Sequence, residues 1–176
     1  VKRDLMRLID AALSRSIPLL IGSAGGAGAR PHLDWCVAII EDCLQDLNRS
    51  AKVAVISADQ SAVELLAAHR SKRITPLGPV FDLTDGLIAE STHVVAQMGV
   101  EPIVRALDQG AEIVVTGRCY DPAVFAAVPL RRGFPEALAL HMGKILECAA
   151  IAAVPGSGAD CMLGTLTHDS FVLEPL

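Results

Sequence analysis

The sequence is poor in aromatic residues and in positive charge. Aromatic side chains make up 3% of the 176 residues, and 15 Lys and Arg stand against 20 Asp and Glu, so the formal net charge is −5. Proteins that bind nucleic acids normally carry a basic surplus, and single strands are commonly held by aromatic stacking. We therefore expect no nucleic-acid partner.

Long apolar runs and paired cysteines are also lacking. No uninterrupted run approaches the roughly 18 apolar residues of a membrane span, and we expect neither a membrane segment nor a signal peptide. The five cysteines are scattered, no C-x-x-C pair occurs, and the histidines show no H-x-x-x-H spacing. These absences argue against a metal site and are typical of reduced thiols, so we expect a cytoplasmic protein without a bound metal.

What the chain has in abundance is apolar content, at 52% of its residues, enough for one domain with a core. Apolar runs that favour strands alternate with helical patterns, which predicts a mostly parallel sheet with helices on both faces. We expect a single three-layer, doubly wound α/β domain over residues 1–176. The strands are predicted at Ile17–Gly22, Lys52–Ser57, Glu112–Thr116 and Cys161–His168, with a further edge strand over 170–176.

The helices are predicted at Asp4–Ser14, His32–Leu47, from Asp59 or Ser61, Leu87–Met98, Pro102–Gln109, from Pro122, and Glu136–Ala153. Right-handed crossovers place all the loops from strand to helix at one edge of a parallel sheet, where such sheets bind ligands. We therefore expect four loops to share that edge: 22–30, 57–59, 117–121 and 165–169. Most of the polar residues of this apolar chain lie in them.

The first loop, "GSAGGAGAR", is rich in glycine. Gly25, Gly26 and Gly28 would let the backbone turn and approach a ligand closely, and the loop leads to a helix N-terminus, which favours an anion. Arg30 would add a guanidinium group. The loop matches neither the dinucleotide fingerprint nor a P-loop, and a tight turn without a ligand is the alternative.

The stretch "GRCYDP" follows the third predicted strand. Asp121 is a good N-cap and Pro122 a good first helical residue, and we also count Asp121 among the candidate ligand-binding residues. Arg118 lies at the carboxyl end of an apolar strand, so we predict that it binds an anionic ligand, with a salt bridge to Asp121 as the alternative. Cys119 would act as a nucleophile only beside a base, and a buried structural thiol is the favoured interpretation.

The helix "PEALALHMGKILECAAIAA" carries His141, Lys144 and Glu147 at i, i+3 and i+6, which we assign to one side of it. Burial in so apolar a helix would lower the pKa of Lys144 and make it a base, or Lys144 would pair with Glu147. An ion pair at a solvent-exposed rim is the alternative without a functional role. A second pair, His168 and Asp169, would serve acid–base chemistry or only make a loop polar.

Four stretches together resemble the acyclic terpene utilisation (AtuA) family: "IGSAGGAGARPHLDW", "VVAQMGVEPIVRALDQGAEIVVTGR", "YDPAVFAA" and "ALHMGKILECAA". The resemblance runs from about Gly22 to Leu176. It implies a place in bacterial breakdown of acyclic terpenes and related branched acids, whose intermediates are CoA esters. Family members are longer at both ends, so we expect an internal fragment. The resemblance assigns no catalytic role to any residue.

We expect a metabolic enzyme that acts on a small carboxylated or CoA-linked, branched substrate by lyase, hydratase or isomerase chemistry. Lys144 with Glu147 or His141 would move a proton next to a carbonyl, while Arg118 and the glycine loop hold the anionic group. No cofactor fingerprint is evident. A non-catalytic metabolite-binding or assembly subunit is the alternative, and a lowered pKa of Lys144 would favour the enzyme. We also expect a homo-oligomer, or contacts with the missing parts of a longer chain.

Overall fold

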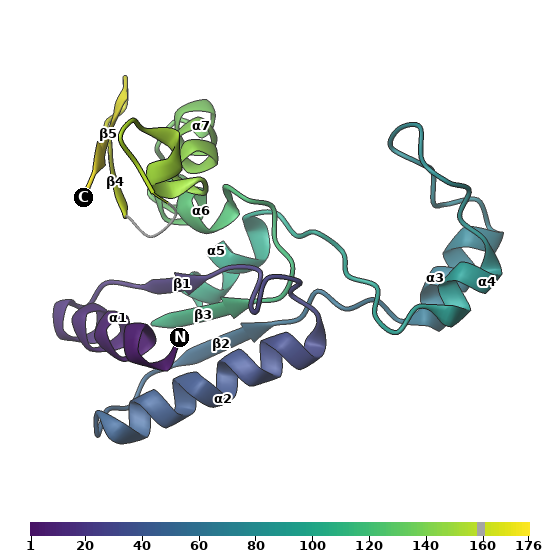
Figure 1. Cartoon of the computed structure of the whole chain (residues 1–176), viewed down its shortest axis with the longest axis horizontal. Helices are drawn as coiled ribbons and strands as arrows, with labels where there is room; N and C mark the ends of the chain where they lie inside the picture. The colour runs from purple at the N-terminus through teal and green to yellow at the C-terminus, as the bar shows by residue number, and fades with distance from the viewer. Residues whose placement is uncertain (158–160) are drawn as a thin grey trace.

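A parallel sheet of three strands forms the centre of the chain (Figure 1). The computed structural model describes residues 1–157 and 161–176. The strands are β1 (Leu19–Ile21), β2 (Val53–Ile56) and β3 (Ile113–Thr116), in the order β1-β3-β2. All four residues of β3 are buried, as expected for the central strand of a sheet covered on both faces. The mixed α/β class and the parallel pairing are thereby confirmed.

Helices α1 (Lys2–Arg15) and α2 (Arg30–Asp46) pack on the side of the sheet to which Ile113 and Val115 point. Their apolar residues recur at helical spacing, and Ile9 and Ile40 are fully buried there. The amphipathic pattern of each helix therefore predicted the face that it buries.

Helices α5 (Glu101–Asp108) and α6 (Ala123–Arg131) join a second apolar cluster, which includes Val114 of β3. Successive residues of a strand point to opposite faces, so Val114 meets Ile103 and Ala123 in that cluster while its neighbours on β3 belong to the first one. The described residues contain a parallel sheet of three strands, and the complete three-layer, doubly wound arrangement stays a prediction.

The fourth predicted strand does not join the parallel sheet. β4 (Met162–Leu166) pairs antiparallel with β5 (Phe171–Pro175) in a separate sheet of two strands. Its side chains alternate between half-buried and exposed, which is the pattern of a strand covered on one face. That face packs on α7 (Glu136–Leu146), where Gly164 lies against Met142 and Leu146. The expectation that the loop 165–169 shares the ligand edge is therefore wrong.

The long helix predicted to end at Ala153 is shorter, because α7 ends at Leu146 and a 3₁₀ helix, η1 (Ala149–Ala152), follows. Ala149 has a φ of 49°, which an α-helix does not accommodate. None of the helices in the described part of the chain combines the length and apolar character needed to cross a membrane.

Residues 60–94, which we call the arm, leave the carboxyl end of β2 and return as an extended segment (Figure 1). The arm holds α3 (Ala62–Arg70) and α4 (Asp85–Glu90), which pack on each other. The helix predicted over Leu87–Met98 is wrong beyond Glu90, because the backbone is extended at Ser91 and Val95 bridges Asp59. Ser61 is the N-cap residue of α3, as one of the two predicted helix starts implies, but its side chain makes no cap hydrogen bond.

Candidate functional site

Three of the four predicted loops meet at the carboxyl end of the parallel sheet. The Arg118 amide donates to the Gly28 carbonyl at 3.2 Å, and the Gly117 amide donates to the Ile56 carbonyl at 2.7 Å. The Ser23 amide in turn donates to the Gly117 carbonyl at 3.1 Å. The sequence placed the loops after β1, β2 and β3 at one edge, and the structure confirms this.

Glycine in the first loop is required chiefly by close packing. Gly28 has a φ of +69°, and a Cβ there would lie 2.2 Å from the amide nitrogen of Arg118. A Cβ at Gly25 would lie 2.6 Å from Cβ of His32, whereas Gly26 faces open space. The tight-turn interpretation therefore accounts for Gly28, and anion binding by Gly25, Gly26 and Gly28 stays a prediction.

Several amides of this loop already have acceptors within the protein. Those of Ser23 and Ala24 donate to the end of β3, and those of Gly26 and Gly28 donate within the loop. Arg30 belongs to the first turn of α2, and its Nε lies 2.8 Å from the Asp34 carboxylate. In this arrangement the Arg30 guanidinium is engaged on its own helix, and its role as a ligand residue stays a prediction.

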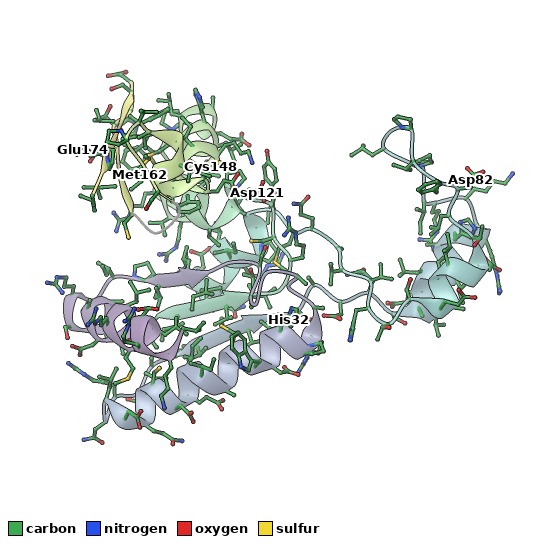
Figure 2. All side chains as sticks on the ribbon, viewed as in Figure 1. His32, Asp82, Asp121, Cys148, Met162 and Glu174 are labelled. Atoms are coloured by element: carbon green, nitrogen blue, oxygen red, sulfur yellow. The ribbon has the colours of Figure 1, made fainter. Side chains whose placement is uncertain are left out.

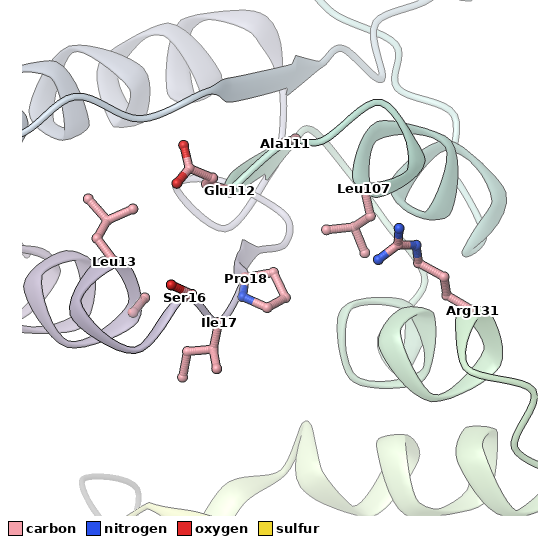
Figure 3. Close-up of a pocket in the computed structure, with 9 residues that line it drawn as sticks. Leu13, Ser16, Ile17, Pro18, Leu107, Ala111, Glu112 and Arg131 are labelled. Atoms are coloured by element: carbon pink, nitrogen blue, oxygen red, sulfur yellow. The ribbon is translucent and has the colours of Figure 1, made fainter.

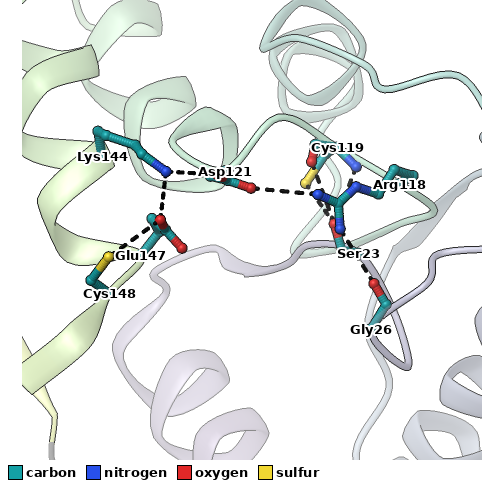
Figure 4. A network of polar contacts seen from close by, with 8 residues as sticks. All are labelled: Ser23, Gly26, Arg118, Cys119, Asp121, Lys144, Glu147 and Cys148. Atoms are coloured by element: carbon teal, nitrogen blue, oxygen red, sulfur yellow. Dashed lines mark hydrogen bonds and ion pairs between the residues drawn. The ribbon is translucent and has the colours of Figure 1, made fainter. Parts of the chain in front are cut away.

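Arg118 reaches across the end of the sheet between two partners (Figure 4). One guanidinium nitrogen donates to the Gly26 carbonyl at 3.4 Å, and another lies 3.6 Å from Oδ1 of Asp121. The side chain is 36% exposed, so it is neither buried nor fully solvated. The salt bridge that we considered as the alternative is present, but both contacts are long, which leaves donors for a ligand anion.

Asp121 does not cap a helix, contrary to the prediction. Pro122 occupies the N-cap position of α6 and no side chain caps that helix. The helix begins one residue later than predicted, at Ala123, although the backbone of Pro122 is already in the right-handed helical region. The Asp121 carboxylate turns instead toward α7, where its Oδ2 accepts a hydrogen bond of 2.7 Å from Lys144.

Lys144 is held between two carboxylates. Its ammonium group donates to Asp121 at 2.7 Å and to Glu147 at 2.6 Å (Figure 4). Hydrogen bonds to Asp121 and then Glu147 raise the pKa of Lys144, and they outweigh its desolvation. The side chain is half exposed, because α7 presents it at the rim. The predicted lowering of the Lys144 pKa is therefore wrong, while the pairing with Glu147 is confirmed.

The pKa values of the two carboxylates shift in the opposite direction to that of Lys144. The Lys144 hydrogen bond lowers the pKa of Asp121 and that of Glu147, so both groups are held as anions. The Cys148 thiol donates to Glu147 at 3.3 Å, and this bond to the carboxylate raises the pKa of the thiol. The network contains two cations and two anions, so it is locally neutral.

His141 lies apart from Lys144 and Glu147, although we assigned the three to one side of the helix. Its ring makes an edge-to-face contact with Phe171 of β5 at 5.2 Å. At about 100° per residue, six positions along a helix are separated by roughly 120° around its axis, and α7 ends before Glu147. His168 also packs on an aromatic ring, that of Phe134, at 4.9 Å.

A cleft of about 420 Å³ lies over this network. Leu20, Val124 and Phe125 form its apolar wall. Its polar lining includes Ser23, which the sequence reasoning missed although it directly follows the glycine at the end of β1. The Ser23 hydroxyl accepts from the Cys119 amide at 3.2 Å, which ties the first loop to the loop after β3. The remaining lining residues are Gly22, Arg118, Cys119, Asp121 and Glu147.

Cys119 is 3% exposed, and its sulfur lies 3.7 Å from the Ser23 hydroxyl. A buried thiol beside a hydroxyl matches the structural interpretation that the sequence favoured. Among the described residues, no group of three or more His, Cys, Asp or Glu is arranged to hold a metal ion.

A second cavity, of about 180 Å³, opens where α1 leads into β1, at the opposite end of the strands (Figure 3). Leu13 and Ile17 are among its apolar lining residues. Its charged groups already have partners, since Arg131 pairs with Asp108 at 2.7 Å and Glu112 accepts from the Lys52 amide. The cleft at the carboxyl end is therefore the better candidate for binding a charged ligand.

The fold and cleft define an α/β protein with a mixed-charge cleft at the carboxyl end of its central parallel strand. The model of the family "Acyclic terpene utilisation family protein AtuA" matches residues 2–157, and the chain belongs to this family. The matched range begins and ends earlier in the chain than the stretch from about Gly22 to Leu176 over which the sequence resembles the family. A search of the curated proteins and one of the solved structures each found no match. Membership in the family implies a role in acyclic terpene utilisation.

Proposed function

We propose that the cleft binds a small, branched acyl compound that carries a carboxylate or is linked to CoA. The observation that carries the proposal is the composition of the cleft, which is lined by Arg118 together with the apolar residues Leu20, Val124 and Phe125. A guanidinium group suits a carboxylate or phosphate, and the wall suits a short branched hydrocarbon. Membership in a terpene utilisation family agrees with such a ligand.

We further propose that the site transfers a proton next to the substrate carbonyl, in a lyase, hydratase or isomerase reaction. Glu147 is the proposed base, because its carboxylate lines the cleft and is held as an anion. Lys144, whose pKa is raised, stays cationic and would stabilise the negative charge that develops on the carbonyl oxygen. The proposed roles thus differ from the first expectation, in which Lys144 was the base.

Thermal melting of the wild-type chain with branched short-chain acyl-CoA esters, the corresponding free acids and CoA alone tests binding. Stabilisation by the esters or acids beyond that by CoA is expected. Exchange of the acyl α-proton in D₂O, followed by NMR, then tests chemistry. Glu147→Gln should lower the exchange rate by on the order of 100-fold. If no compound raises the melting temperature, the proposed ligand class is wrong.

A non-catalytic metabolite-binding or assembly subunit is the second candidate, and one observation favours it. The raised pKa of Lys144 is what a passive ion pair gives, whereas a lowered pKa would have favoured catalysis by this residue. Ligand stabilisation without any α-proton exchange would select this candidate over the enzyme.

We infer a three-layer arrangement, supported by the two apolar clusters that share β3. We infer a cytoplasmic location, supported by five free thiols. We infer chemistry without a bound cofactor, supported by the absence of a dinucleotide or P-loop fingerprint from the sequence.

A further inference from the structure

The arm exposes apolar side chains to an unusual degree. Phe81 is 97% exposed and Leu77 104% exposed, and Val63 and Val80 are also largely exposed. Ile88 is the one buried side chain among residues 60–94, all of which lie in the described part of the chain. Neither apolar cluster of the described residues includes a residue of the arm. A segment of this size does not stay ordered on so little burial, so we expect another surface to cover it.

The body of the same chain does not supply that surface. Figure 1 shows α3 and α4 standing clear of the sheet, joined to it by two extended segments. Asp82 lies on the arm, well separated from Asp121 and from His32 at the start of α2 (Figure 2). The described residues of the body therefore leave the arm uncovered, and we look for the covering surface on a second copy of the chain.

The chain itself offers a matching groove, of about 330 Å³, between the free edge of the sheet and α5. β2 is an edge strand, paired with β3 and with no other strand of the described residues, and such edges are prone to cover by another chain. The groove is apolar along Ala54, Val55 and Ile56, and Arg105 lies at its side. Val55 is 44% exposed.

Charge complementarity selects this groove as the partner of the arm. Among the described residues, neither Asp82 nor Arg105 has a salt bridge, whereas Asp85 pairs with Arg70 and Asp108 with Arg131. Asp82 follows the exposed Phe81 directly, and Arg105 flanks the apolar floor of the groove. An aromatic ring with an adjacent carboxylate therefore fits an apolar groove with an adjacent guanidinium.

We propose that the arm of one copy docks in the β2–α5 groove of a second copy, with Phe81 on the apolar floor and Asp82 paired with Arg105. Each copy has one arm and one groove, so reciprocal docking gives a closed dimer. The proposal does not depend on the proposed activity, because no residue of the ligand cleft takes part.

Sedimentation velocity over a range of concentrations tests the proposal. Wild type should dimerise, and Phe81→Ser should raise the dimer dissociation constant at least about tenfold. Because Phe81 is almost fully exposed, this change should leave the folded monomer intact, which circular dichroism checks. Val172→Ser, at an exposed apolar residue of β5, is the matched control and should dimerise normally.

A charge exchange makes the test specific for the two surfaces. Asp82→Arg and Arg105→Asp should each weaken the dimer about tenfold or more, and the double variant should restore it to near the wild-type level. Arg132→Asp, at an exposed arginine without an ion pair among the described residues, is the control for charge and should have no effect. A monomeric wild type, a dimer insensitive to these changes, or a double variant no better than the single ones would each overturn the proposal.

Discussion

The ammonium group of Lys144 lies 2.7 Å from Oδ2 of Asp121 and so joins α7 to the loop that follows β3. The two residues are 23 positions apart in the sequence. Through Glu147 on one side and Arg118 on the other, this contact connects the four charged groups of the network. The contact also raises the pKa of Lys144, which burial was expected to lower, because a lysine between two carboxylates is held in its charged form.

Acid should destabilise the wild-type chain partly through this contact. Folding lowers the pKa of Asp121 from 3.8 and that of Glu147 from 4.5. Such groups contribute stability above their unfolded pKa values, and the contribution is lost as the pH falls through the folded values. Lys144→Gln should therefore lose less stability than wild type between about pH 5 and pH 2. Urea unfolding across this range measures the difference.

Lys72→Gln provides the control for that experiment, because Lys72 forms no salt bridge with a described residue. Its pH dependence should follow that of wild type. An identical acid dependence for wild type and Lys144→Gln would contradict the assigned role of the contact.

Arg118→Lys should weaken binding of a small carboxylate or acyl-CoA ester by on the order of tenfold, with little loss of stability. Lysine keeps the positive charge but lacks the planar pair of donors that matches a carboxylate or phosphate. Arg132→Lys is the control, since Arg132 is exposed, does not line the cleft and forms no salt bridge with a described residue. Calorimetric binding and thermal melts measure the two effects. If the Arg118→Lys variant binds normally but melts well below wild type, Arg118 is a structural residue.

Gly28→Ala should destabilise the fold far more than Gly26→Ala. Both glycines have positive φ, at +69° and +89°, so alanine is strained at either position by about 1–2 kcal/mol. At Gly28 the added Cβ would also meet the Arg118 backbone at 2.2 Å, which adds roughly 1–3 kcal/mol of overpacking. Denaturant unfolding of both variants checks this. Equal losses would show that backbone conformation alone requires Gly28.

Thiol labelling of the native chain should distinguish the five cysteines, all of which are free. Cys161 is exposed and should react first. Cys36 and Cys43 are buried, and burial raises the pKa of each thiol, so both should react slowly. Time-resolved labelling with mass spectrometry gives the order, and Cys161→Ser should remove the fast phase. A fast phase that persists in this variant would contradict the assignment.

The core strands and helices could be predicted from the sequence because their signals are local. The apolar runs of β1, β2 and β3 and the helical spacing of α1, α2 and α5 each specify an element and the face that it buries. Parallel pairing then places three loops at one edge, which is why Gly28 and Arg118 could be expected to lie together.

Two of the failures share one cause, which is that a pattern shows which face of an element is apolar but not what covers it. β4 has the composition of a core strand, yet it pairs with β5 and packs on α7. The apolar residues after Glu90 have helical spacing, yet Val95 forms an antiparallel β-bridge with Asp59.

By itself, the sequence determined the α/β class, the parallel core and the edge at which three loops meet, since these follow from apolar periodicity and the handedness of crossovers. Only the tertiary structure decided the partners of the charged side chains. Asp121 meets Lys144 instead of capping α6, and His141 meets Phe171 instead of the cleft. Such partners depend on distances between elements far apart in the chain, and a shift of a few ångströms changes which charge a carboxylate meets and hence its pKa.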